Sequence, residues 1–146
     1  PRGCGLADDF ASLISPDMWP EFVVPYWNQL YEGLTTGSSR FLHCENLAPA
    51  HLRHLKSAKV TYFQPSVSPM LTLEKVRENT DIPIDWLLYP FHIVNMSDEE
   101  IQEWVDTTVR AGVTIIRTQF GRFACENGKL DRIKAFYRAF EKYSVK

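Results

Sequence analysis

The rest of the chain is arranged around the stretch Arg40-Phe41-Leu42-His43-Cys44-Glu45-Asn46. Its first residues favour a β-strand, and the alternation of side chains along a strand places Phe41, His43 and Glu45 on one face. An imidazole and a carboxylate therefore lie side by side where the strand ends. In parallel α/β proteins, this end of the strands is where substrates bind. The stretch predicts a functional site, and the alternative is a capped strand end with a surface ion pair.

The segments around this stretch alternate between helix and strand patterns. Helices are predicted to begin at Ser15-Pro16, Pro49, Thr72, Ser97 and Lys129, because Ser and Thr cap helices, Pro suits the first turn and apolar residues recur every three to four positions. Strands are predicted over the ranges 40–45, 59–64, 82–89 and 113–117, and a strand or loop over 3–9. Repeated strand–helix units predict an α/β fold with a parallel sheet in one domain over residues 1–146.

Composition limits the class of protein. The chain has 146 residues, is 45% hydrophobic and has a formal net charge of -2, which is typical of a globular domain with a real core. No basic run exists to neutralise the phosphates of a nucleic acid, and no apolar run approaches the ~20 residues of a membrane helix. Three widely spaced cysteines do not resemble a disulfide framework, so a cytoplasmic location is expected. The start at Pro1 suggests a fragment or a processed product.

The carboxyl ends of the predicted strands are expected to meet at one edge of the sheet. That edge would collect residues from every strand end: Asp8, Asp9, His43, Cys44, Glu45, Tyr62, Gln64, Tyr89, His92, Arg117 and Gln119. Arg117 ends an apolar strand, and a buried guanidinium needs an anion. Each of the others also has a structural interpretation, as a solvated acid, a packing tyrosine or a histidine bonded to backbone.

Metal binding is a second hypothesis for the same edge. His43 and Glu45 would need at least a third ligand, which Cys125 or His92 could supply from other loops. No CxxC or HExxH spacing supports it. His51 and His54 have helical i, i+3 spacing, but solvated helix histidines are far commoner than metal ligands.

Several segments carry a resemblance to a known family. The most specific is Ser15-Pro16-Asp17-Met18-Trp19-Pro20-Glu21-Phe22-Val23-Val24-Pro25-Tyr26, which follows Asp8-Asp9-Phe10. Further matches lie in the ranges 43–46, 86–90, 118–121 and 127–135. Together they resemble the uroporphyrinogen decarboxylase superfamily over nearly the whole chain. The resemblance implies part of a (β/α)8 TIM barrel, roughly strands four to eight with their helices. It also implies a partner, either the missing N-terminal half-barrel or another copy in a homodimer.

The resemblance implies one of two activities. The methyltransferase branch moves a methyl group between a corrinoid and a thiol or other acceptor, and binds zinc through His-x-Cys and a last-loop Cys. Here His43 is kept, Glu45 replaces the first Cys, and Phe120 replaces the second, with Cys125 nearby. A gap-free match anchored on Asn46 would instead keep Cys44 and place Leu42 at the histidine position.

The decarboxylase branch uses a last-loop histidine, and this chain has Gln119-Phe120-Gly121 there. We therefore expect an enzyme of methyl transfer, with a corrinoid as cofactor or substrate protein and zinc as a further cofactor. The alternatives are uroporphyrinogen decarboxylation, a lyase reaction of porphyrin biosynthesis, and a non-catalytic relative that binds a tetrapyrrole or a partner protein. The expected catalytic residues are His43, Glu45 and Arg117, the substrate-binding residues Asp9, Tyr62, Gln64 and His92, and the zinc ligands His43, Glu45 and Cys125.

Overall fold

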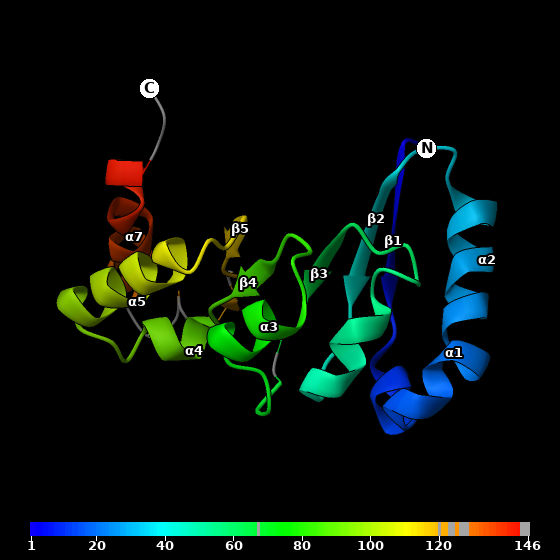
Figure 1. Ribbon diagram of the computed structural model, residues 1–146. Coiled ribbons are helices and arrows are strands. Elements are labelled where there is room, and N and C mark those ends of the chain that lie inside the picture. Colours follow the sequence, from blue (N-terminus) through cyan, green and yellow to red (C-terminus); the bar gives the residue numbers. More distant parts are fainter. Residues whose placement is uncertain (67, 120, 123–124, 126–128, 144–146) are drawn as a thin grey trace. The chain divides into compact units, whose positions relative to one another are not determined.

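Two compact units make up the chain (Figure 1). A computed structural model describes residues 1–66, 68–119, 121–122, 125 and 129–143. The first unit comprises Pro1–Asp85 and the second comprises Trp86–Lys146. Parallel strands and helices alternate along the chain, so the predicted α/β class is confirmed.

The first unit is built on a parallel sheet of three strands in the order β1-β2-β3. The strands are β1 (Gly3–Ala7), β2 (Ser39–His43) and β3 (Tyr62–Gln64). Leu42 pairs with Leu6 on one side and with Phe63 on the other. Leu42 and Phe63 are fully buried, so the centre of the sheet forms part of the core. This register also aligns the carboxyl ends of all three strands.

Short helices connect the strands of the first unit. They are η1 (Asp9–Leu13), η2 (Pro16–Met18), α1 (Trp19–Phe22), α2 (Val24–Leu34), η3 (Pro49–His54) and α3 (Leu73–Asn79). The long helix predicted after Ser15 is interrupted at Val23, whose φ is -124°. Pro25 follows closely and has no N–H to donate to the preceding turn, which explains the break.

Aromatic residues of the helices fill the core beside the sheet. Trp19 and Trp27 are buried and meet edge to face, with ring centroids 5.1 Å apart. The Tyr31 hydroxyl donates a 2.7 Å hydrogen bond to the carbonyl oxygen of Phe41 and so ties α2 to β2. In the connection from α2 to β2, Gly37 lies very close to the backbone of Arg2. An added Cβ would be 1.8 Å from the Arg2 carbonyl oxygen. Only glycine fits there.

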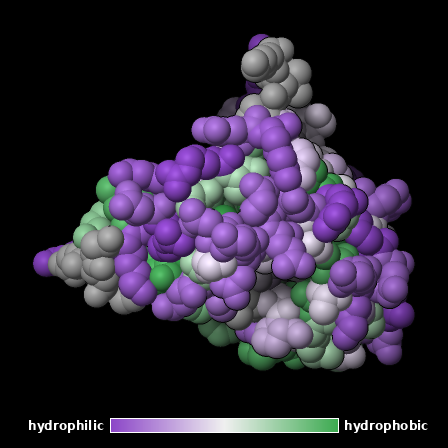
Figure 2. All heavy atoms as spheres, turned by 90° about the vertical axis from the view of Figure 1, so that its left-hand side faces the viewer, coloured by the Kyte–Doolittle hydropathy of each residue, from purple (hydrophilic) through white to green (hydrophobic). Residues whose placement is uncertain are grey.

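The second unit has a helical core beside a two-stranded parallel sheet. Its elements are β4 (Asp85–Leu87), which begins at the last residue of the first unit, α4 (Pro90–Ile93), α5 (Asp98–Arg110), β5 (Ile115–Arg117), α7 (Leu130–Ala139) and η4 (Glu141–Tyr143). Ile101 and Val105 of α5 pack against Ile133 and Phe136 of α7, all of them buried. Figure 2 shows that the surface over α5 and α7 is mostly hydrophilic.

The prediction of part of a TIM barrel, strands four to eight, is wrong. In the part of the chain that the structure describes, the strands form two small parallel sheets, of three and two strands, rather than the wall of a barrel. Proline explains where the wall is interrupted, because it cannot donate to a strand ladder. Pro65 ends β3, and Pro83 lies in the next predicted strand, where only one isolated bridge joins Phe63 to Ile84. The predicted partner, a missing half-barrel or a second copy of the chain, was inferred from the barrel. Without the barrel, that inference has no basis.

None of the helices among the described residues is both long enough and apolar enough to cross a membrane.

Candidate functional site

The predicted site forms at the carboxyl edge of the three-stranded sheet. His43 is the last residue of β2 and lies opposite Gln64, the last residue of β3. Asp9 comes two residues after β1, and Glu45 comes two residues after β2. The parallel register therefore brings together four side chains that are far apart in the sequence, as the strand pattern predicted.

His43 is the centre of this cluster. Its Nδ1 lies 2.7 Å from Oε1 of Gln64, and Gln64 is buried. An amide oxygen can only accept a hydrogen bond, so this contact assigns a proton to Nδ1. In the neutral ring Nε2 then carries the lone pair. Nε2 lies 3.7 Å from Oδ1 of Asp9 and 3.9 Å from Oε1 of Glu45.

The two carboxylates around Nε2 are held by further contacts. Oδ1 of Asp9 accepts a 2.9 Å hydrogen bond from the backbone N–H of Glu45, which links the ends of β1 and β2. Oε1 of Glu45 accepts a 2.7 Å hydrogen bond from the Ser66 hydroxyl. The His43 side chain retains 24% of its exposure, so a small molecule can reach the ring. The cluster is anchored yet open to solvent.

Ser66 was not identified from the sequence. It has a positive φ of 46°, a conformation that costs energy for a residue other than glycine. Asn46 also has a positive φ, 60°, but Asn tolerates this region better. A serine directly after a strand-ending proline gave no signal of its role, because its contact with Glu45 depends on how the strands pair.

Asp8 and Cys44 support the site without taking part in it. The carboxylate of Asp8 accepts hydrogen bonds from the Ala11 N–H and from Nε1 of Trp27, so it anchors η1 and α2 at the end of β1. The Cys44 side chain is fully buried. Burial, with the nearby carboxylates, raises the pKa of the thiol to about 12. Cys44 is therefore a neutral packing residue on the opposite face of the strand from His43.

Tyr62 packs against the sheet. Its ring lies 4.7 Å from that of Phe41, centroid to centroid, on the neighbouring strand. This contact agrees with the packing interpretation of Tyr62. Gln64, by contrast, contacts His43 directly, which gives it a positioning role that the sequence alone did not indicate.

The remaining predicted residues belong to the second unit. Arg117 is exposed in β5, so the expectation of a buried guanidinium is wrong. His92 lies in α4 with its ring 4.1 Å from that of Phe91. Cys125 is an exposed free cysteine. Phe120, which the resemblance aligns with a zinc ligand, lies outside the described residues.

The metal hypothesis has limited support from the geometry. Among the residues that the structure describes, no group of three or more His, Cys, Asp or Glu side chains is arranged to hold a metal ion. The i, i+3 pair His51 and His54 is not such a site either. Nδ1 of His51 accepts from the Ala48 N–H at 3.0 Å and Nε2 lies 3.1 Å from the Ile14 carbonyl oxygen, so both nitrogens are occupied by backbone.

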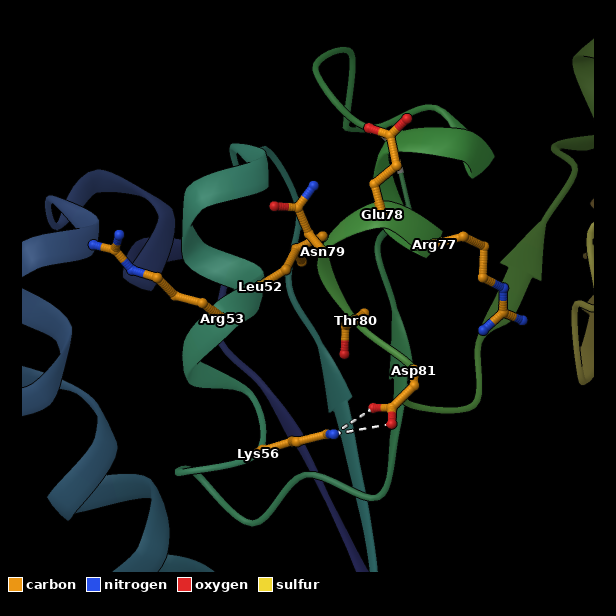
Figure 3. Close-up of a pocket in the computed structure, with 8 residues that line it drawn as sticks. All are labelled: Leu52, Arg53, Lys56, Arg77, Glu78, Asn79, Thr80 and Asp81. Atoms are coloured by element: carbon orange, nitrogen blue, oxygen red, sulfur yellow. Dashed lines mark hydrogen bonds and ion pairs between the residues drawn. The ribbon is translucent and has the colours of Figure 1, made fainter.

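A cavity elsewhere in the first unit contains none of the predicted site residues. It has a volume of about 310 Å³ and is lined by Leu52, Arg53, Lys56, Arg77, Glu78, Asn79, Thr80 and Asp81. Figure 3 shows Arg53 and Arg77 pointing away from each other, while Lys56 is bound to Asp81. The charged groups therefore do not converge on a common ligand position.

Comparisons with known proteins do not identify the chain. No protein-family model matches it, and no curated protein sequence matches it significantly. The resemblance to the uroporphyrinogen decarboxylase superfamily therefore stands only on the motifs quoted above.

Proposed function

We propose that this chain carries the proton-transfer centre of an enzyme of methyl transfer, related to the uroporphyrinogen decarboxylase superfamily. The observation that carries the proposal is the position of His43 Nε2 beside Asp9 and Glu45, with Nδ1 held by Gln64. Histidine is the side chain best suited to gain and lose a proton near neutral pH. The methyl-transfer assignment comes from the sequence resemblance.

Methyl transfer to a thiol, alcohol or amine requires the acceptor to lose a proton as its new bond to carbon forms. Nε2 of His43 would take that proton, because the hydrogen bond to Gln64 keeps the other ring proton on Nδ1. The imidazolium that results would be stabilised by the Asp9 and Glu45 carboxylates. A corrinoid, when bound, would supply the methyl group. The arrangement is that of a general base whose orientation is fixed by its neighbours.

Zinc enters this proposal only as an alternative role for His43 and Glu45. The two residues offer one nitrogen and one oxygen donor, whereas zinc in proteins takes three or four protein ligands. Cys44 does not supply the thiolate, because its buried side chain lies on the opposite face of the strand from His43. The residues around His43 therefore do not fit the family's His/Cys zinc site, and the proposed proton transfer needs no metal.

Uroporphyrinogen decarboxylation is the second candidate function. A protonated His43, with the Asp9 and Glu45 carboxylates near Nε2, could donate a proton to the carbon that loses carbon dioxide. The missing last-loop histidine argues against it. For either reaction we propose a cytoplasmic location, because all three cysteines are free.

The test is a turnover assay on the purified protein. Methylcobalamin is incubated with a thiol, an alcohol or an amine, and the methylated product is measured by mass spectrometry. We expect methylation of at least one acceptor, and loss of this activity in His43→Ala. Metal content is measured in the wild type and in His43→Ala. One zinc per chain in the wild type, absent from His43→Ala, would favour a zinc site over metal-free proton transfer.

Two other results would contradict methyl transfer. Release of carbon dioxide from uroporphyrinogen would identify a decarboxylase. Tight binding of a porphyrin or corrinoid without any turnover would identify a non-catalytic relative. In either case the His43 cluster would need a different interpretation.

A further inference from the structure

A basic groove lies at the amino end of β2, at the other end of the strand from His43. It has a volume of about 360 Å³ and is lined by Ser38, Arg40, Lys56, Lys59, Val60 and Thr61. Three of these six residues are cationic, two carry hydroxyl groups and none is acidic. Arg40 and His43 are three residues apart on an extended strand, about 10 Å along the sheet. A ligand in this groove would therefore not touch His43.

Arg40 is the most informative residue in the groove. The backbone is fixed by Thr61, because the Arg40 N–H donates to the Thr61 hydroxyl at 2.8 Å and the Arg40 carbonyl oxygen accepts from the Thr61 N–H at 2.9 Å. The guanidinium carbon lies 5.6 Å from the centroid of the Tyr31 ring. Nη1 is buried and has no hydrogen-bond partner among the described residues. A buried charged donor without a protein partner is costly, and an anion bound in the groove would satisfy it.

The two lysines already have carboxylate partners. Lys56 pairs with Asp81, an ion pair drawn in Figure 3 whose atoms are 2.8 Å apart, and Lys59 pairs with Glu32. Both lysine side chains are at least half exposed, so solvent screens these pairs and either lysine can turn toward a ligand. Each lysine is thus neutralised by one carboxylate. The positive charge of Arg40 is left without a matching carboxylate among these pairs.

The turn that carries Lys59 adds a second observation. Lys59 has a positive φ of 55°, in the left-handed region that favours glycine or asparagine. A lysine held there stores strain, and strained positions gather at ligand-binding sites. Glycine would relieve the strain but would remove a cation from the groove.

From these features we propose that the groove binds an oxyanion of the phosphate type, either inorganic phosphate or a phosphate monoester. A tetrahedral dianion can accept hydrogen bonds from the Arg40 guanidinium and the lysine ammonium groups at once, and Ser38 can donate from the rim. The site is independent of the methyl-transfer proposal, since it uses the opposite end of the sheet.

The experiment is isothermal titration of the purified protein with sodium phosphate and with glycerol 3-phosphate, at constant ionic strength. We expect one saturable site. Arg40→Gln should weaken binding roughly tenfold, because a charge-assisted hydrogen bond is lost. Arg53→Gln is the matched control: it removes the same charge from an arginine of the same unit that does not line the groove. It should change the affinity by less than about twofold.

Two further variants separate binding from folding. Glu32→Gln releases Lys59 from its ion pair and should tighten phosphate binding about threefold, a gain that a purely structural ion pair would not produce. Ser38→Glu places a carboxylate at an exposed position of the groove and should abolish binding without unfolding the protein. Binding of the ester alone would identify a phosphorylated metabolite or headgroup as the natural ligand. Absence of binding by both anions, or equal effects of Arg40→Gln and Arg53→Gln, would overturn the proposal.

Discussion

At the residue scale, the strand alternation in 40–46 separates a polar face from a buried one. His43 meets Gln64 and two carboxylates on one face, and Cys44 is buried on the other. The period of two along a strand was sufficient to predict this separation. The sequence could not predict that Gln64 would orient the imidazole, because that contact depends on the register between β2 and β3.

Cys44 provides a prediction at this scale. Its thiol pKa is raised to about 12, chiefly by burial, from the usual value of 9.0. Since each pKa unit reduces the thiolate fraction tenfold, alkylation by iodoacetamide at pH about 8 should be on the order of 1,000-fold slower than for an exposed cysteine. The rate is measured by mass spectrometry in a Cys4→Ser, Cys125→Ser variant, with the urea-unfolded protein as control. Equal rates in the folded and unfolded protein would contradict the buried position.

At the element scale, the helices that begin after Thr72 and Ser97 start where their capping residues predicted, whereas Ser15 makes no cap hydrogen bond. Thr72 caps α3 and Ser97 caps α5, and in both cases the side chain accepts a hydrogen bond from the backbone at N3. These signals are local, so they can be read directly from the sequence. The strands were predicted too long, because their ends depend on pairing with distant segments; only β4, between Pro83 and Pro90, has a proline on each side.

The α5 cap gives the prediction for this scale. In the capping box, Ser97 Oγ accepts from the Glu100 N–H and Glu100 Oε2 accepts from the Ser97 N–H. Ser97→Ala should lower the free energy of unfolding by about 1 kcal/mol. The measurement is the urea midpoint followed by far-UV circular dichroism. Ser57→Ala, at an exposed serine outside any helix cap, is the control and should have little effect. A Ser97→Ala protein as stable as the Ser57→Ala control would show that the cap contributes nothing.

At the scale of the whole molecule, the α/β class was predictable and the barrel was not. Alternating strand and helix patterns specify parallel strands. The number of strands that join one sheet depends on pairing between distant segments, and Pro65 and Pro83 limit it to three in the first unit. A family resemblance cannot replace that information. The arrangement of Asp9, His43, Glu45 and Gln64 does not depend on a barrel, because it needs only β1, β2 and β3.

Stability against acid is a prediction for the whole molecule. Burial and the nearby Arg53 lower the pKa of His54 below 6.5, and the ring accepts a 3.0 Å hydrogen bond from Arg53 Nε that only a neutral ring can accept. The unfolded chain therefore binds this proton at higher pH than the folded chain, so stability is lost as the pH falls below 6.5. Urea midpoints at pH about 7.5 and about 5.5 should differ less in His54→Gln than in the wild type. If the midpoint changes with pH by the same amount in His54→Gln as in the wild type, protonation of His54 does not cause the loss of stability in acid.

His43 is proposed to take the proton from the methyl acceptor, and this role can be measured directly. The most direct measurement is kcat/KM for methyl transfer in the wild type, in His43→Gln and in His54→Gln, the last being a histidine of the same unit outside the site. We predict a loss of roughly 10²- to 10⁴-fold for His43→Gln, as expected when a general base is removed, and less than about a twofold change for His54→Gln. A His43→Gln enzyme with wild-type kcat/KM would contradict the claim.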